Sequence, residues 1–181
     1  TELEQEKKLL EKEKEKLDKT KINIKDVDKE TRLIDFIVRK ILDLRLEGVY
    51  GTIYSLGKVE RKYELALEVV AGSRYNAIIV EDDQIAEKCI RYLRENKLGT
   101  AIFLPLNKIR LNELRPEQKQ LIKAEGVEDI ALELVKFNPR FRNAFSYVYG
   151  NTLILDNLDS VRKLGIGRIR MVTLEGDLVE Q

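Results

Sequence analysis

The chain has 181 residues, of which 43% are apolar and 36% are charged, and its 33 basic and 32 acidic residues leave a net charge of +1. This composition excludes a disordered chain, and the balanced charge leaves only local basic patches as evidence for nucleic-acid binding. The single cysteine excludes an internal disulfide and indicates a reducing, cytoplasmic compartment, and the absence of histidine removes the commonest general base and metal ligand.

Residues 1–21 are rich in Glu and Lys and predict a helix. An apolar residue recurs at every seventh position, at Leu3, Leu10, Leu17 and Ile24, as in one seam of a coiled coil. The second seam position holds Glu6 and Glu13, so the pattern leaves open a coiled-coil arm or a single solvated helix. The chain begins without Met inside this pattern, and we therefore expect a fragment of a longer protein.

The next segments predict a helix, a strand and a second helix. Apolar residues at helical spacing run through 28–46, with Asp28 as the expected N-cap. A strand is expected at 49–54, and residues 59–71 predict a helix with Gly72 as its C-cap.

A β-α-β unit follows. Residues 77–80 form a short apolar strand, Asp82 or Asp83 caps the next helix, and the strand at 101–104 ends before Pro105.

The polar connection at 106–125 is the expected boundary between two halves of the chain. After it, residues 127–135 predict a short amphipathic helix. Asn138 and Pro139 then begin a helix that ends at Gly150.

A second β-α-β unit completes the chain. Its strands are expected at 152–155 and 169–174, with Asp156 or Asn157 as the helix cap between them. Residues 175–177 form a tight turn into a last apolar pair at 178–179.

The two units repeat one order of helix, strand, acidic cap, helix, glycine turn and strand, which favours an internal duplication. The predicted fold is therefore α/β (α+β), with two related subdomains of mixed sheets and flanking helices at 28–112 and 113–181. A coiled-coil arm at 1–27 precedes them.

No residue pattern indicates catalysis or a metal site. The acidic residues after the strands lack a second group to complete a mechanism, so helix capping explains them better. The sequence contains no phosphate-binding loop and no Cys-x-x-Cys pair, and Cys89 lies on an apolar helix face. We expect no catalytic residues, no metal and no cofactor in this chain.

Several small basic clusters are candidate phosphate contacts. Neutralisation of phosphates by Arg and Lys would give weak, salt-dependent and sequence-independent DNA binding. A solvated face is the ordinary interpretation of such clusters. The DNA-binding candidates are Arg39, Lys40, Arg45, Arg61 and Lys62.

The order of motifs resembles the hinge domain of SMC (structural maintenance of chromosomes) proteins over about residues 46–181. The resemblance rests on a Gly-Val-x-Gly segment at 48–51, a Tyr-x-x-Ala-x-Glu helix at 63–68 and a Phe-Leu-Pro-Leu segment at 103–106. It continues with Gly-x-Thr at 150–152 and Val-Thr-Leu-Glu-Gly-Asp-Leu at 172–178. The usage of Lys, Glu and Ile resembles that of hyperthermophiles, and with the resemblance we expect an archaeal, thermophilic source.

This resemblance implies a hinge that pairs with a second copy and joins two coiled-coil arms into a ring or rod. The arms would lead to distant ATPase heads, in a cytoplasmic, chromosome-associated protein of chromosome condensation and segregation. Pairing by strand addition at sheet edges places the expected interface near Gly48, Gly51 and Gly176. The alternatives are a nucleic-acid-binding module without obligate dimerisation and a small α/β ligand-binding enzyme, for which the sequence offers no site.

Overall fold

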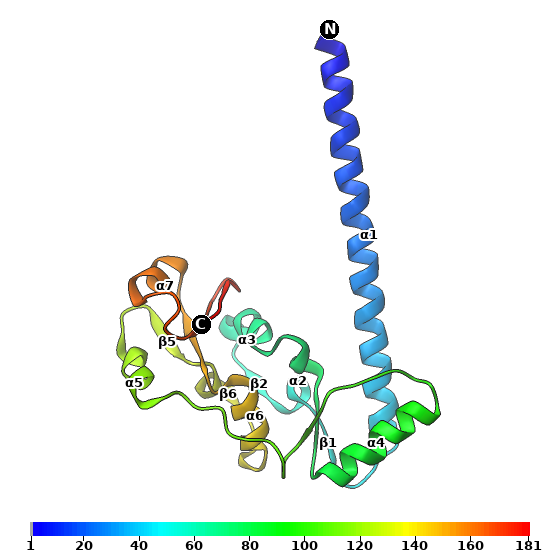
Figure 1. Ribbon diagram of the computed structural model, residues 1–181, viewed down its shortest axis with the longest axis vertical. Coiled ribbons are helices and arrows are strands. Elements are labelled where there is room, and N and C mark those ends of the chain that lie inside the picture. The colour runs from blue at the N-terminus through cyan, green and yellow to red at the C-terminus, as the bar shows by residue number, and fades with distance from the viewer. Residues whose placement is uncertain (1) are drawn as a thin grey trace.

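The computed structural model describes residues 2–181, without the side chains of residues 2 and 22–27. A single long helix, α1 (Glu2–Asp43), stands away from a two-part body (Figure 1). The expected helix start at Asp28 is wrong, because the segment holds no Gly or Pro and the helix runs through it. Leu3, Leu10 and Leu17 are more than half exposed, while Ile24 lies outside the described side chains.

The first half of the body is built on a three-stranded sheet. Its strands are β1 (Val49–Thr52), β3 (Ile78–Val80) and β4 (Phe103–Pro105), with β3 in the centre. The central strand is antiparallel to β1 and parallel to β4. Helix α4 (Asp83–Glu95) begins at the expected cap, since the side chain of Asp82 accepts a hydrogen bond from the Ile85 amide at 2.8 Å. This helix and the end of α1 pack on the sheet through Ile37, Ile41 and Cys89.

The second half has a four-stranded sheet in the order β5-β7-β8-β9. The bounds are β5 (Val127–Ile130), β7 (Thr152–Leu155), β8 (Arg170–Thr173) and β9 (Leu178–Val179). Its helices are α5 (Pro116–Lys119), α6 (Arg142–Tyr149) and α7 (Leu158–Leu164), and Asn157 caps α7 as expected.

The expected helix at 127–135 is wrong. Residues 127–130 form strand β5, which pairs antiparallel with β7, and a 3-10 turn, η4 (Ala131–Leu134), follows it. The apolar spacing of this short segment fits a helix as well as a strand, and pairing with a distant strand decides the outcome.

The internal duplication is visible in the strand register. In β1, Val49 lies opposite Val80, and after a bulge Gly51 lies opposite Ile79. In β5 the same bulge separates the pair Val127–Leu155 from the pair Asp129–Ile154. In both halves a parallel strand then follows on the far side of the central strand. The two halves are therefore structural repeats.

The repeats join around a pseudo-twofold axis. Strand β2 (Lys58–Val59) pairs antiparallel with β6 (Val135–Lys136), and Lys58 lies opposite its own counterpart, Lys136. Helix α2 (Ile53–Leu56) precedes β2, and a 3-10 turn, η1 (Arg61–Tyr63), leads from β2 into α3 (Glu64–Ala71). The core at this junction is shared, because residues of α3 and α6 and of both sheets belong to one buried cluster.

Candidate docking edges and the junction between the halves

A cluster of polar contacts around Arg140 connects the second half to the first. Arg140, in the 3-10 turn η5 (Pro139–Phe141) before α6, lies 3.2 Å from the carboxylate of Glu81 and donates to the Tyr50 hydroxyl. Its guanidinium group also lies 4.4 Å from the centre of the Tyr50 ring. The hydrogen bond from the Tyr50 hydroxyl, and then the contact with Arg140, lower the pKa of Glu81.

A reciprocal contact runs from the first half to the second. Lys62, the counterpart of Arg140 in the repeat, lies 3.2 Å from the carboxylate of Glu128 in β5. Tyr63 donates its hydroxyl to the same carboxylate at 3.1 Å. The hydrogen bond to Glu128 raises the pKa of Lys62. The two contacts lie on opposite sides of the pseudo-twofold axis, and both connect the first half to the second.

The outer edges of the two sheets differ although the halves are repeats. In the second half β9 covers β8, with Met171 opposite Val179 and Val172 opposite Leu178. The counterpart of β8 in the first half is β4, and in the part of the chain that the structure describes no strand pairs with its outer side. An edge of this kind offers backbone groups to another strand.

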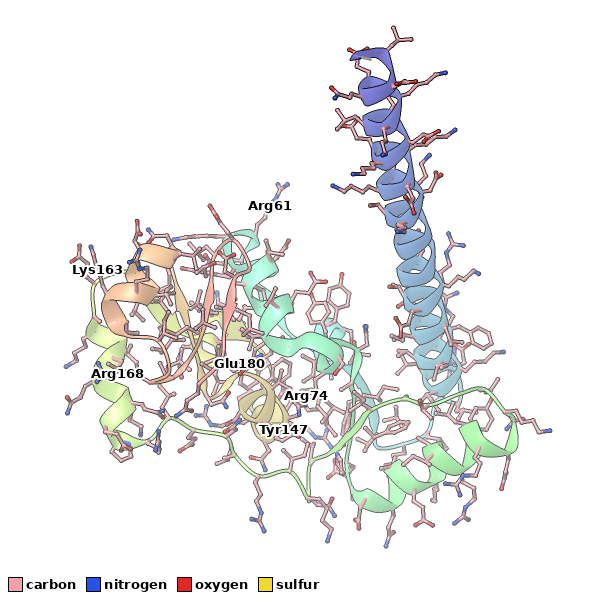
Figure 2. The ribbon with its side chains drawn as sticks, turned by 45° about the horizontal axis from the view of Figure 1, so that its top comes forward. Arg61, Arg74, Tyr147, Lys163, Arg168 and Glu180 are labelled. Carbon is pink, nitrogen blue, oxygen red and sulfur yellow. The ribbon has the colours of Figure 1, made fainter. Side chains whose placement is uncertain are left out.

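A groove of about 420 Å³ runs along this uncovered edge. One wall is β4 itself, and the other carries Arg74, Lys108, Arg110 and Tyr147. Figure 2 shows Arg74 and Tyr147 side by side, with the guanidinium group of Arg74 4.9 Å from the ring centre. The groove is therefore basic along an open strand.

The segment around β9 has the opposite charge. It carries Glu175, Asp177 and Glu180, and the last of these lies 3.3 Å from Arg170. Leu178 in β9 is 43% exposed. The chain thus presents one basic edge at β4 and one acidic edge at β9.

Each of the three glycines expected at an interface packs against residues of its own chain. Gly48, Gly51 and Gly176 all have positive φ angles. A Cβ atom at Gly48 would lie 3.2 Å from Ile85, and one at Gly176 would lie 3.3 Å from Leu65. Intramolecular packing and backbone conformation are sufficient to explain glycine at these positions.

The basic residues expected to bind DNA do not form one face. Arg39 and Lys40 lie exposed near the end of α1, and Arg45 follows the helix. Figure 2 shows Arg61 at the outer end of α3, away from α1, and Lys62 is bound to Glu128. The basic residues of the β4 groove were not predicted, because they come from segments far apart in the sequence and form no run.

The polar residues after the strands have different roles: Asp83 accepts a hydrogen bond from the Asn107 side chain at 2.8 Å, and Asp156 Oδ1 is buried without a hydrogen-bond partner within the described part of the chain. Asp82 and Asn157 are helix caps. Among the described residues no group of three His, Cys, Asp or Glu side chains is placed to hold a metal ion. Cys89 is buried, and its burial raises the pKa of the thiol. None of the described helices is both long enough and apolar enough to cross a membrane.

Comparisons with known proteins agree on one family. The model of the SMC proteins flexible hinge domain matches residues 46–165. The chromosome partition protein Smc of Synechococcus is 43% identical over 142 residues, and that of Methanocaldococcus jannaschii is 39% identical over 149. The alignments cover 78% and 81% of this chain but only 12% of each relative.

Solved structures give the same result for the fold. An asymmetric dimer of the Geobacillus stearothermophilus SMC hinge domain matches with a TM-score of 0.76 and 33% identity, over 80% of this chain and 60% of that one. The Pyrococcus furiosus SMC hinge domain matches with a TM-score of 0.68 and 36% identity, over 79% and 74% of the two chains.

Proposed function

The chain belongs to the flexible hinge domains of SMC proteins, and from this premise we propose that it pairs with a second copy of itself. The observation that carries the proposal is the uncovered outer edge of β4, whose counterpart in the second half is covered by β9. A strand from another copy would complete the first half in the way that β9 completes the second.

The strand that pairs with β4 is best supplied by β9 of the other copy, because the β9 segment is acidic and its Leu178 is exposed. The groove beside β4 carries Arg74, Lys108 and Arg110, while the segment around β9 is acidic. Pairing β4 of each copy with β9 of the other would form two equal contacts, which closes a twofold ring. Pro105 lacks an amide hydrogen and would end the pairing at Phe103. Gly176 lies just before β9, whereas Gly48 and Gly51 belong to the β1 edge on the other side of β3 and take no part in this pairing.

Cross-linking tests where the copies meet. Cys89 is buried and does not compete with introduced thiols. We expect a mixture of the Arg110→Cys and Glu180→Cys chains to form a disulfide between copies under mild oxidation. A mixture of Lys123→Cys with Glu180→Cys serves as the control. Equal cross-linking in the two mixtures would place the interface elsewhere.

The proposal also concerns the longer protein to which this chain would belong. The chain spans 12% of the length of the curated relatives that it matches. We propose a chromosome-associated ATPase of chromosome condensation and segregation, with the arm at 1–27, hinge subdomains at 28–112 and 113–181, and its ATPase heads in other parts of the parent. A groove of about 600 Å³ beside the exposed Leu33 and Ile34 of α1 suits a second arm helix.

DNA contact is a second proposal and concerns the junction of arm and hinge. Arg39, Lys40 and Arg45 are exposed there. Replacing all three by Gln should reduce the slope of log affinity against log salt by about two to three units. An unchanged slope would exclude this site. Lys62→Gln is the control: Lys62 is already paired with Glu128, so its replacement should leave the slope unchanged.

A further inference from the structure

A cavity unrelated to the sheet edges opens beside the pseudo-twofold axis. It has a volume of about 690 Å³ and lies between α2, α3 and the β2–β6 pair. This volume is in the range of sites for small ligands and single side chains. We call it the tyrosine–glutamate cavity, after the side chains that give it its chemistry: Tyr54, Tyr75, Tyr149, Glu64 and Glu68.

Tyr149 lines the cavity with a hydroxyl that lacks a partner. The residue is only 2% exposed, and among the described residues its hydroxyl makes no hydrogen bond. Among the described residues the fully buried side-chain oxygen without a partner is Asp156 Oδ1, so the Tyr149 hydroxyl oxygen keeps contact with solvent and is open to a ligand in the cavity. Burial, and then the neighbouring Tyr75, raise its pKa well above the usual value, so it stays a neutral phenol. A polar group entering the cavity would satisfy it.

Two further tyrosines form an aromatic wall. The rings of Tyr54 and Tyr75 lie 5.0 Å apart between centres and are tilted by 52°. Tyr54 is 62% exposed, so its ring is available to a ligand at the mouth of the cavity. The faces of aromatic rings carry negative charge density and attract cations.

Two carboxylates complete the cavity with negative charge. Glu64 and Glu68 lie one turn apart on α3, where like charges repel each other. In the described part of the chain neither forms an ion pair, and no Lys or Arg lines the cavity. Both carboxylates line the same cavity as Tyr75. Burial first, and then the charges of Glu68, Tyr54 and Glu64, raise the pKa of Tyr75.

We propose that the tyrosine–glutamate cavity binds an organic cation, an ammonium or guanidinium group carried on an apolar stem. The N–H donors would bond to the carboxylates and to the Tyr149 oxygen, and the stem would lie against the tyrosine rings and the apolar floor of Ile53 and Val135. The ligand is a lysine or arginine side chain of a protein or a free alkylamine, which share this chemistry.

Titration with defined cations tests the proposal. The chain has no Trp, so its intrinsic emission comes from its seven tyrosines, of which Tyr54, Tyr75 and Tyr149 line the cavity. The probes are butylammonium, butylguanidinium and a capped Gly-Gly-Lys-Gly-Gly peptide, with butanol as the uncharged control. We expect saturable binding of the cations and none of butanol. Tighter binding of the peptide than of butylammonium would assign a protein side chain, and equal binding would assign a free amine.

Matched variants separate this cavity from general electrostatics. Glu64→Gln with Glu68→Gln should weaken binding by about tenfold. Glu95→Gln with Glu113→Gln removes the same charge from exposed positions elsewhere and should leave binding unchanged. Tyr149→Phe keeps the packing and should also weaken binding. The proposal is overturned if no cation binds saturably, or if the cavity variants and the control variants weaken binding equally.

Discussion

Arg140 links the two halves through an exposed pair of contacts whose strength depends on geometry more than on charge. Its guanidinium group lies against the Tyr50 ring and close to Glu81. The ion pair is about half exposed and therefore contributes little by itself. The stacked arrangement gives the contact its direction and fixes where the first half meets the second.

Replacing Arg140 by Ala should lower the free energy of unfolding by about 1 kcal/mol, mainly through loss of the contact with the Tyr50 ring. Arg140→Lys should recover only part of the loss, because an ammonium group cannot stack in the same way. Urea unfolding measures both effects. Arg142→Ala is the control, since Arg142 is a neighbouring exposed arginine. A loss as large in Arg142→Ala would refute a specific role for Arg140.

Tyr149 makes stability depend on pH in alkaline solution. Its pKa is raised in the folded state from an ordinary value of 10.0. Below pH 10 the phenol is protonated in both states and its full contribution is present. Above pH 10 the unfolded state loses the proton while the folded state keeps it, so stability falls as pH rises, by about 1.4 kcal/mol per pH unit. Tyr149→Phe should flatten this decline in urea unfolding at pH 10 to 11, and an unchanged slope would contradict it.

At the scale of elements, the short β2–β6 pair joins the halves but carries an unfavourable charge arrangement. Lys58 and Lys136 lie directly opposite each other, and both are exposed. Like charges at such a position destabilise a strand pair. The arrangement follows from the pseudo-twofold axis, which places equivalent positions of the two repeats face to face.

Replacing Lys136 by Glu should therefore stabilise the fold by about 0.2 to 1 kcal/mol, because it creates an opposite-charge pair across β2 and β6. Thermal unfolding measures the gain. The reversal Lys123→Glu, which lies outside the paired strands, is the matched control. No gain in Lys136→Glu over the control would show that the pair is too solvated to matter.

Sequence patterns predicted most elements of the body but not their contacts. The helix caps at Asp82, Asn138 and Asn157 and the helix end at Gly72 are confirmed, because these residues act within one or two turns. The helix start at Asp28, the end of the strand expected at 49–54 and the helix at 127–135 were wrong. Continuity of a helix and pairing of β5 depend on residues farther away, and Thr52 ends β1 by capping α2.

The candidate site was less predictable than the fold for the same reason. The basic groove at β4 gathers Arg74, Lys108 and Arg110 from separate segments. Gly48, Gly51 and Gly176 were predicted to lie at the interface between copies. In the structure each of them packs against residues of its own chain. The interface role of these glycines stays a prediction, as does the archaeal source, because the relatives include both bacterial and archaeal proteins.

At the scale of the whole molecule, two repeats with the same register differ in one respect. The second half has its outer edge covered by β9, and the first half has its corresponding edge open. A chain built in this way carries both an open edge and a strand suited to cover it. Pairing of two copies would satisfy both edges.

The most direct test of this claim is the absolute mass in solution, measured by light scattering across a concentration series. We predict a mass near twice 21.0 kDa at high concentration. Lys108→Glu with Arg110→Glu should shift the chain towards monomer, because it reverses the charge of the β4 groove. Lys119→Glu with Lys123→Glu, the same charge change at exposed positions elsewhere, should leave the mass unchanged. A monomeric mass for the unaltered chain at every concentration would contradict the account.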